Sequence, residues 1–150
     1  MDIKEHTNPD ALEKYAFLWS EVRLPIAALA LFLGGVPPVY YLLRIPGLIG
    51  IVGGGLTICW LISGLASLYL LYRWYVGGQK IFGKSDMQDM VAFFVLVVSG
   101  INLGLVGVTG SNIGMRISSN YIVFIIVGVL YLWAMWRLYS QWSKNGKKLF

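Results

Sequence analysis

Charged residues are scarce in this chain of 150 residues. Asp, Glu, Lys and Arg make up 13% of it, whereas a soluble domain has about 25%. Hydrophobic residues make up 57%, and the mean hydropathy is +0.69. This balance excludes an ordinary water-soluble domain and predicts an integral membrane protein.

Residues that bind metals or form disulfides are equally scarce. The chain has one cysteine, Cys59, and one histidine, His6. A single cysteine cannot form a disulfide within the chain, and one cysteine with one histidine does not suit a zinc site. No phosphate-binding glycine motif or nucleic-acid module is visible. We therefore expect no metal, no cofactor and no nucleic-acid partner, and we interpret Cys59 as a small buried residue.

Residues 1–23 are polar and mildly acidic. They lack the basic start and short apolar core of a secretory signal, so we expect them to be retained. Asn8 and Pro9 predict the start of a helix, and Tyr15 and Trp19 share its apolar face. This pattern predicts an amphipathic helix at the membrane interface. A helical extension of the first span into water would produce the same pattern.

Four apolar stretches follow, and each is near the length of about 20 residues that crosses a bilayer. We predict spans over residues 24–43, 48–72, 87–108 and 121–139, followed by a basic tail over residues 140–150. The predicted fold class is therefore an all-α bundle of four transmembrane helices with an N-terminal interfacial helix.

The helix boundaries carry further signals. Pro25 should kink or restart the first helix. Pro37 and Pro38 follow two glycines and free backbone carbonyls inside the first predicted span. These carbonyls either line an ion or water path or lie at a kink that neighbouring helices shield. Ser85 is predicted to cap the third span, with Asp86 in its first turn.

Glycines are regularly spaced in the third predicted span. Gly100, Gly104 and Gly107 follow one another at i, i+4 and i+7 and so line one stripe of a helix. Such a stripe lets a second helix approach closely in a membrane. The second span carries a similar face of small residues: Gly53, Thr57, Gly64 and Ser67.

A second, polar stripe accompanies these glycines. Asn102 lies close in sequence to Ser99 and Thr109. Asn102 either forms a hydrogen bond between helices or contacts a solute in a pore. The candidate polar or pore contacts are Asn102, Ser99, Thr109, Thr57 and Ser67.

The second and fourth spans end alike. Residues 68–75 and 130–139 share a Leu-Tyr-Leu start and a finish of aromatic residues and arginine. A duplicated helical hairpin would explain this, and so would convergence on an interfacial collar. The predicted interfacial anchors are Trp19, Arg73, Trp74, Trp136 and Arg137.

Positive charge is distributed unevenly about the predicted spans. Ten of the twelve Lys and Arg residues lie in the N-terminal segment, the middle loop and the tail, and only Arg44 and Arg116 lie on the other side. The positive-inside rule then places both termini in the cytoplasm.

The third and fourth spans also contain a recognisable motif: Ser99-Gly100-Ile101-Asn102-Leu103-Gly104-Leu105-Val106-Gly107, then Asn112-Ile113, then residues 121–128. Over about residues 90–136 the chain resembles a bacterial membrane family known only as domain of unknown function 378. Its members look like one helical hairpin with a Gly-x-Asn-x-Gly-Leu-Val-Gly core, and they usually have Trp where this chain has Leu103. The resemblance implies a hairpin in the bacterial inner (plasma) membrane and brings no known activity.

Ionisable groups are missing from the centres of the predicted spans. Between Leu24 and Tyr139, no Asp, Glu, Lys or His lies at mid-span, whereas proton relays and coupled transporters depend on such groups. The serines, Thr57 and Cys59 have no His or Lys base at membrane depth. The chain is therefore predicted not to be an enzyme or a proton-coupled transporter.

The function that remains is structural. We expect a small non-enzymatic protein of the lipid bilayer that acts through helix packing, as an accessory subunit or an oligomeric scaffold. Its partners would be further copies of itself or other membrane proteins. The alternative is a homo-oligomeric channel for ions or small neutral solutes.

Overall fold

The computed structural model describes residues 8–43 and 45–150 of the chain, and the regular elements in this part are helical. Four long helices form a bundle: α2 (Pro9–Phe32), α4 (Ile49–Val76), α5 (Met87–Thr109) and α7 (Tyr121–Lys144). Each is long and apolar enough to cross a membrane. Three short elements lie between them: α3 (Val39–Leu42), η1 (Pro46–Leu48) and α6 (Ile113–Ile117).

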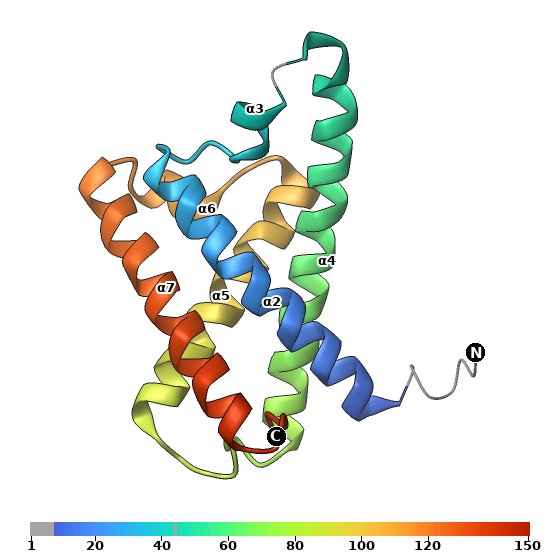
Figure 1. Ribbon diagram of the computed structural model, residues 1–150, viewed down its shortest axis with the longest axis vertical. Coiled ribbons are helices and arrows are strands. Elements are labelled where there is room, and N and C mark those ends of the chain that lie inside the picture. The colour runs from blue at the N-terminus through green and yellow to red at the C-terminus, as the bar shows by residue number, and fades with distance from the viewer. Residues whose placement is uncertain (1–7, 44) are drawn as a thin grey trace.

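The long helices alternate in direction. The connections that contain α3 and α6 lie at one end of the bundle, and the loop between α4 and α5 lies at the other end with the C-terminus (Figure 1). Helix α2 packs against α4 and α7, and α5 packs against the same two helices. Helices α2 and α5 also touch each other, so they form the centre of the bundle.

Helix α2 differs from the prediction for this region. Asn8 caps it as predicted, because the Asn8 side-chain oxygen accepts the N–H of Ala11 at 2.7 Å. The helix then runs through Pro25 without a break. A buried or membrane helix tolerates proline where neighbouring helices shield the freed carbonyl. Residues 24–43 therefore do not form one separate helix as predicted: a single helix combines residues 24–32 with the segment before it, as in the alternative of a helical extension.

The end of α2 has a clear cause. Gly34 and Gly35 adopt φ angles of +76° and +89°, in the left-handed region that favours glycine. Pro37 and Pro38 then prevent the helix from continuing. The chain resumes only in the single turn of α3, and residues 1–7 of the predicted interfacial segment lie outside the described part.

The other long helices begin within one residue of the predicted starts, at Ile49, Met87 and Tyr121. Asp86 rather than the predicted Ser85 caps α5, because its carboxylate accepts the N–H groups of Gln88 and Asp89 at 2.8 and 3.1 Å. A carboxylate at this position also complements the positive end of the helix dipole.

The predicted basic tail does not extend freely from the bundle. Helix α7 continues to Lys144, and the last residues fold back under the bundle. The N–H of Leu149 donates to Glu13 Oε1 at 3.2 Å, and its carbonyl accepts the N–H of Phe82 at 2.8 Å. The Phe150 ring packs edge-on against Phe93. These contacts close the end of the bundle at which the chain terminates.

The glycine stripe of α5 faces α4. A Cβ atom added to Gly64 would lie 2.7 Å from Gly104 Cα, so the two backbones are in direct contact. A Cβ at Gly107 would lie 3.1 Å from Leu61. Gly53 is different, because a Cβ there would meet only the Tyr40 hydroxyl at an ordinary 3.6 Å.

Candidate functional site: a buried polar cluster

The middle of α2 carries three polar residues in the interior of the bundle. Ser20, Glu21 and Arg23 expose 0%, 4% and 7% of their surface. The prediction that no Asp, Glu, Lys or His lies at mid-span covered only the residues between Leu24 and Tyr139. Because α2 begins at Pro9, the middle of this helix includes Glu21 and Arg23, which lie before that range. A buried ionisable group in a membrane helix is by default a candidate functional site.

One sequence signal could have revealed these residues. Glu13, Phe17, Glu21, Leu24 and Ala28 follow one another at intervals of three or four and are all buried. This spacing describes one continuous helical face that runs through Pro25. We had interpreted the proline as a boundary, and the face was therefore divided between two predicted elements.

Arg23 connects α2 to α5. Its Nη2 donates to the carbonyl of Leu96 at 2.7 Å, and its Nη1 donates to Ser99 Oγ at 3.0 Å. The Ser99 hydroxyl in turn donates to the Leu96 carbonyl at 2.9 Å. Tyr131 of α7 also interacts electrostatically with the guanidinium. Arginine stays protonated in proteins, so these oxygens surround a buried positive charge.

Gly100 provides the space for this arrangement. A Cβ atom at Gly100 would collide with Ser67 Oγ and would lie 3.0 Å from Arg23 Nη2. Gly100 was predicted to pack helices together, and the structure shows that it also accommodates the guanidinium and a buried hydroxyl. The glycine stripe and the polar cluster therefore share one residue.

Glu21 has no such partners. Neither carboxylate oxygen accepts a hydrogen bond in the described part of the chain, and no cation forms an ion pair with it there. Ser20 Oγ, Ser67 Oγ and Arg23 Nε are also buried without hydrogen-bond partners. Buried polar groups are normally paired, so this concentration of unpaired groups is unusual.

The other predicted polar contacts lie away from the cluster. The Thr57 hydroxyl donates to Gly53 O at 3.0 Å, and the Thr109 hydroxyl donates to Leu105 O at 2.7 Å, each within its own helix. Ser67 and Ser99 are the two predicted contacts that belong to the cluster. The five residues therefore do not converge on a common lumen within one copy of the chain.

Asn102 forms hydrogen bonds between helices, one of the two predicted alternatives, but its partner is the short helix α6. Its side-chain nitrogen donates to Asn112 Oδ1 at 3.0 Å, and its oxygen accepts the N–H of Ile113 at 3.1 Å. Asn112 caps α6. Asn102 thus fixes the start of this short helix onto α5, rather than bonding to another long helix.

Most of the predicted interfacial anchors contact other parts of the bundle. The Trp19 indole donates to Ser63 Oγ at 3.0 Å, and the Trp74 ring packs against Phe93 and Phe94. Trp136 is 65% exposed.

Cys59, which we expected to be buried, is exposed on α4.

The arginine anchors form ion pairs. Arg73 Nη2 lies 3.3 Å from an Asp10 oxygen and 2.8 Å from Glu13 Oε2. Arg137 Nε lies 2.6 Å from an Asp89 oxygen, and its Nη2 lies 3.2 Å from Asp86. The N–H of Asp89 lowers the pKa of Asp86, and the N–H of Gln88 and the charges of Arg137 and Lys84 act in the same direction.

Two open apolar grooves flank the bundle. One, of about 530 Å³, lies between α5 and α7 and extends to Ser99 and Tyr131. The other, of about 360 Å³, lies between α2 and α4 and is lined by residues that include Trp19 and Leu65.

Among the described residues, no group of three His, Cys, Asp or Glu side chains could hold a metal ion.

Comparisons with known proteins add no relative to this picture. No family model, no curated protein and no solved structure matches the chain.

Proposed function

We propose that this chain is a small non-enzymatic membrane protein that acts through helix packing, as an oligomeric scaffold or an accessory subunit. The observation that carries the proposal is the uncovered first half of α4. Gly50, Gly54 and Gly55 have no atom of another element where a Cβ would be. Ile51 and Ile58 are 73% and 60% exposed on the same stretch.

The geometry of α4 supports self-association. Helix α4 extends beyond the other long helices at the end that contains α3 (Figure 1). Its second half already uses a glycine for a close crossing, at Gly64. Small residues on a helix face allow another helix to pack closely in lipid. A second copy that packs against the first half of α4 would use its glycines in the same way.

We also propose that the protein lies in the bacterial inner membrane with both termini in the cytoplasm. The unequal distribution of basic residues supports this orientation. Within the described part of the chain, the basic residues of the middle loop and the tail, Lys80, Lys84, Lys144, Lys147 and Lys148, lie at the end of the bundle with the C-terminus. In a Cys59→Ser background, cysteine in place of Ser111 or Ser118 should react with an impermeant reagent outside intact cells. Cysteine in place of Ser85 or Ser143 should not react, and the reverse pattern would disprove the orientation.

The native cysteine tests the scaffold proposal. Cys59 is exposed on α4, and it is the single cysteine of the chain. Oxidation of native membranes should therefore join two copies through Cys59. Replacing Gly54 or Gly55 by Leu should reduce the fraction of cross-linked chain, because a bulky side chain would separate the two helices.

A matched variant provides the control. Ile126 is 62% exposed on the outer face of α7, so Cys59→Ser combined with Ile126→Cys should cross-link less. Equal cross-linking from both positions, or a particle in mild detergent with the mass of one chain and no partner, would contradict the proposal. Ion or solute flux through reconstituted vesicles would instead favour the alternative of a homo-oligomeric channel.

A further inference from the structure

We propose that Glu21 is a proton-binding site in the interior of the bundle, and that its carboxyl group is protonated at neutral pH while α2 packs against α7. The ligand is a proton from water, which converts the carboxylate into a carboxylic acid and is released when the carboxylate forms again. This inference is independent of the scaffold function, which uses the outer face of α4.

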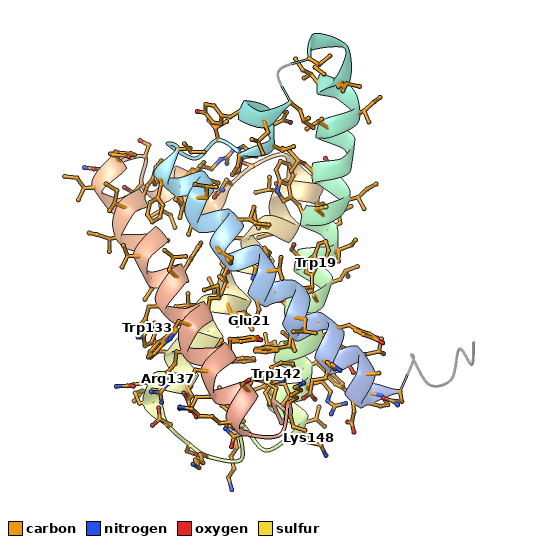
Figure 2. All side chains as sticks on the ribbon, viewed as in Figure 1. Trp19, Glu21, Trp133, Arg137, Trp142 and Lys148 are labelled. Carbon is orange, nitrogen blue, oxygen red and sulfur yellow. The ribbon has the colours of Figure 1, made fainter. Side chains whose placement is uncertain are left out.

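The position of Glu21 follows from the contacts on either side of it. Phe17 packs against Trp142 with a ring-centroid distance of 5.3 Å. Further along α2, Phe32 lies against Gly128, and its carbonyl accepts the Tyr121 hydroxyl at 3.0 Å. Glu21 lies one turn after Phe17 on the same face. It therefore lies at the contact between α2 and α7, and Figure 2 shows it toward α7.

The surroundings of Glu21 at this contact are apolar. In α7, the fully buried residues one and two turns before Trp142 are Leu138 and Ala134. In α2, the fully buried residues Phe17 and Leu24 flank Glu21 on its own face. No hydrogen-bond donor reaches its oxygens in the part of the chain that the structure describes. A buried carboxylate without donors or a paired cation is strongly disfavoured, and such a group binds a proton instead.

Arg23 does not serve as the missing partner. Side chains two residues apart leave a helix on different sides, and the Nη atoms of Arg23 donate to Leu96 and Ser99 of α5. The hydrogen bonds of Arg23 to α5 therefore leave Glu21 without a paired cation in the described part of the chain.

The other titratable groups near this depth are few. Helix α7 contributes Tyr131, which interacts with Arg23. Helices α4 and α5 contribute the neutral hydroxyls of Ser67 and Ser99 at the cluster. The ion pair of Glu13 with Arg73 lies at the end of the bundle, eight residues and about 12 Å along α2 from Glu21. The ion pair of Arg137 with Asp89 lies at the same end.

Glu13 provides a natural comparison within the same helix. It is also buried, at 5% exposure. Arg73 lies 2.8 Å from one of its oxygens, and the other oxygen accepts the N–H groups of Leu149 and Phe150 at 3.2 and 3.3 Å. Glu13 thus has a cation and two N–H donors, whereas Glu21 has neither in the described part of the chain. The two buried glutamates share one helical face and differ in their partners.

Infrared spectroscopy distinguishes the two states, because a protonated carboxyl group has a carbonyl band that a carboxylate lacks. We expect the full-length protein, in a detergent that contains no carbonyl group, to show this band at neutral pH. Glu21→Gln should remove the whole band, whereas Glu13→Gln should retain it. Absence of the band in the wild type, or its persistence in Glu21→Gln, would overturn the proposal.

The pH dependence of thermal unfolding provides a second measurement. A solvated glutamate of the unfolded chain is ionised at neutral pH, so a folded state in which Glu21 is protonated binds one more proton than the unfolded state. Stability must then fall as the pH rises towards neutral. The midpoint temperature of thermal unfolding should fall as the pH rises in the wild type, and it should fall less steeply in Glu21→Gln. Equal slopes in the two proteins would disprove the inference, and the infrared titration of the wild type tests it without any variant.

Discussion

The two halves of the chain are built alike and differ at their centres. The first half consists of α2, α3 and α4, and the second half consists of α5, α6 and α7. Each is a hairpin of two long helices with a short helix in the connection, and both connections lie at the same end of the bundle (Figure 1). Each hairpin also has an open apolar groove between its two long helices.

The ends of the two hairpins are closed in the same way. In the first, Arg73 of α4 binds Asp10 and Glu13, which are three residues apart near the start of α2. In the second, Arg137 of α7 binds Asp86 and Asp89, which are three residues apart at the start of α5. The two hairpins thus agree in their ion pairs as well as in the aromatic ends of their second long helices. This favours duplication of a hairpin over convergence on an interfacial collar.

The correspondence between residues of α2 and α5 extends to the centre of the bundle. The offset that relates Asp10 to Asp86 also relates Arg23 to Ser99, and these two side chains are hydrogen-bonded to each other. Equivalent residues thus meet where α2 and α5 touch. Two arginines at this point would repel each other inside a low-dielectric core. The contact therefore requires the two halves to differ.

One difference between α2 and α5 lies at this contact. Helix α2 has Ser20, Glu21 and Arg23 where α5 has Leu96, Val97 and Ser99. The two hairpins therefore share their ion pairs at the end of the bundle. The charged residues of the polar cluster, Glu21 and Arg23, come from the first hairpin alone. The following variants test this comparison, beginning with the largest expected effect.

The two glycine crossings should respond unequally to alanine. A Cβ at Gly64 would lie 2.7 Å from the backbone of Gly104, whereas at Gly128 it would meet the Phe32 ring, which can rotate. Gly64→Ala should therefore lower the unfolding free energy by about 1–3 kcal/mol and Gly128→Ala by less, as measured by denaturant titration in detergent micelles. Gly47→Ala in η1, where a Cβ would meet no other atom within 4 Å, is the control and should be neutral or stabilising by up to about 1 kcal/mol. Equal losses at Gly64 and Gly128 would contradict the distinction.

The two ion pairs should also differ in strength. Arg137→Gln removes the partner of Asp89, whose side chain is 5% exposed, and should cost about 1.5–3 kcal/mol. Arg73→Gln should cost about 1 kcal/mol, because Glu13 keeps the N–H groups of Leu149 and Phe150. Arg116→Gln in α6 is the exposed control, with an expected change within about 0.5 kcal/mol. A larger loss for Arg73→Gln in the same titration would reverse this ranking.

The caps of α5 and α2 should differ in how well they protect the helix start at acidic pH. We expect this to be the smallest of the predicted effects. The pKa of Asp86 is lowered by the N–H groups that it caps. A lowered pKa contributes stability above the ordinary aspartate value of about 3.9, and that stability is lost as the pH falls through the lowered value. Hydrogen exchange, corrected for its intrinsic pH dependence, should therefore show weaker protection at the start of α5 in acid.

The start of α2 is the internal control for this measurement. Its cap, Asn8, has a neutral amide that does not titrate in this range. Protection of the first turn of α2 should therefore change less in acid than that of α5, and Asp86→Asn should reduce the difference. Parallel loss of protection at both helix starts would show that acid unfolds the whole end of the bundle.

The sequence by itself determined the helices and much of their packing. Apolar stretches of sufficient length predicted three of the four long helices to within one residue at their starts, because length and hydropathy are local properties. The Asn8 cap was equally predictable, since its hydrogen bond reaches only three residues along the chain. The spacing of Gly100, Gly104 and Gly107 predicted a close crossing, although it could not identify Gly64 as the residue on the other side.

Only the tertiary structure decided what lies at the centre. Pro25 removes one backbone hydrogen bond, a local cost that suggested a helix boundary. Packing of α2 against α4, α5 and α7 outweighs that cost and keeps the helix continuous. Continuity places Glu21 and Arg23 in the interior, with Arg23 bonded to residues more than seventy positions away. Burial depends on such distant contacts, so the spacing of residues around Pro25 could suggest a continuous helical face but could not show what covers it.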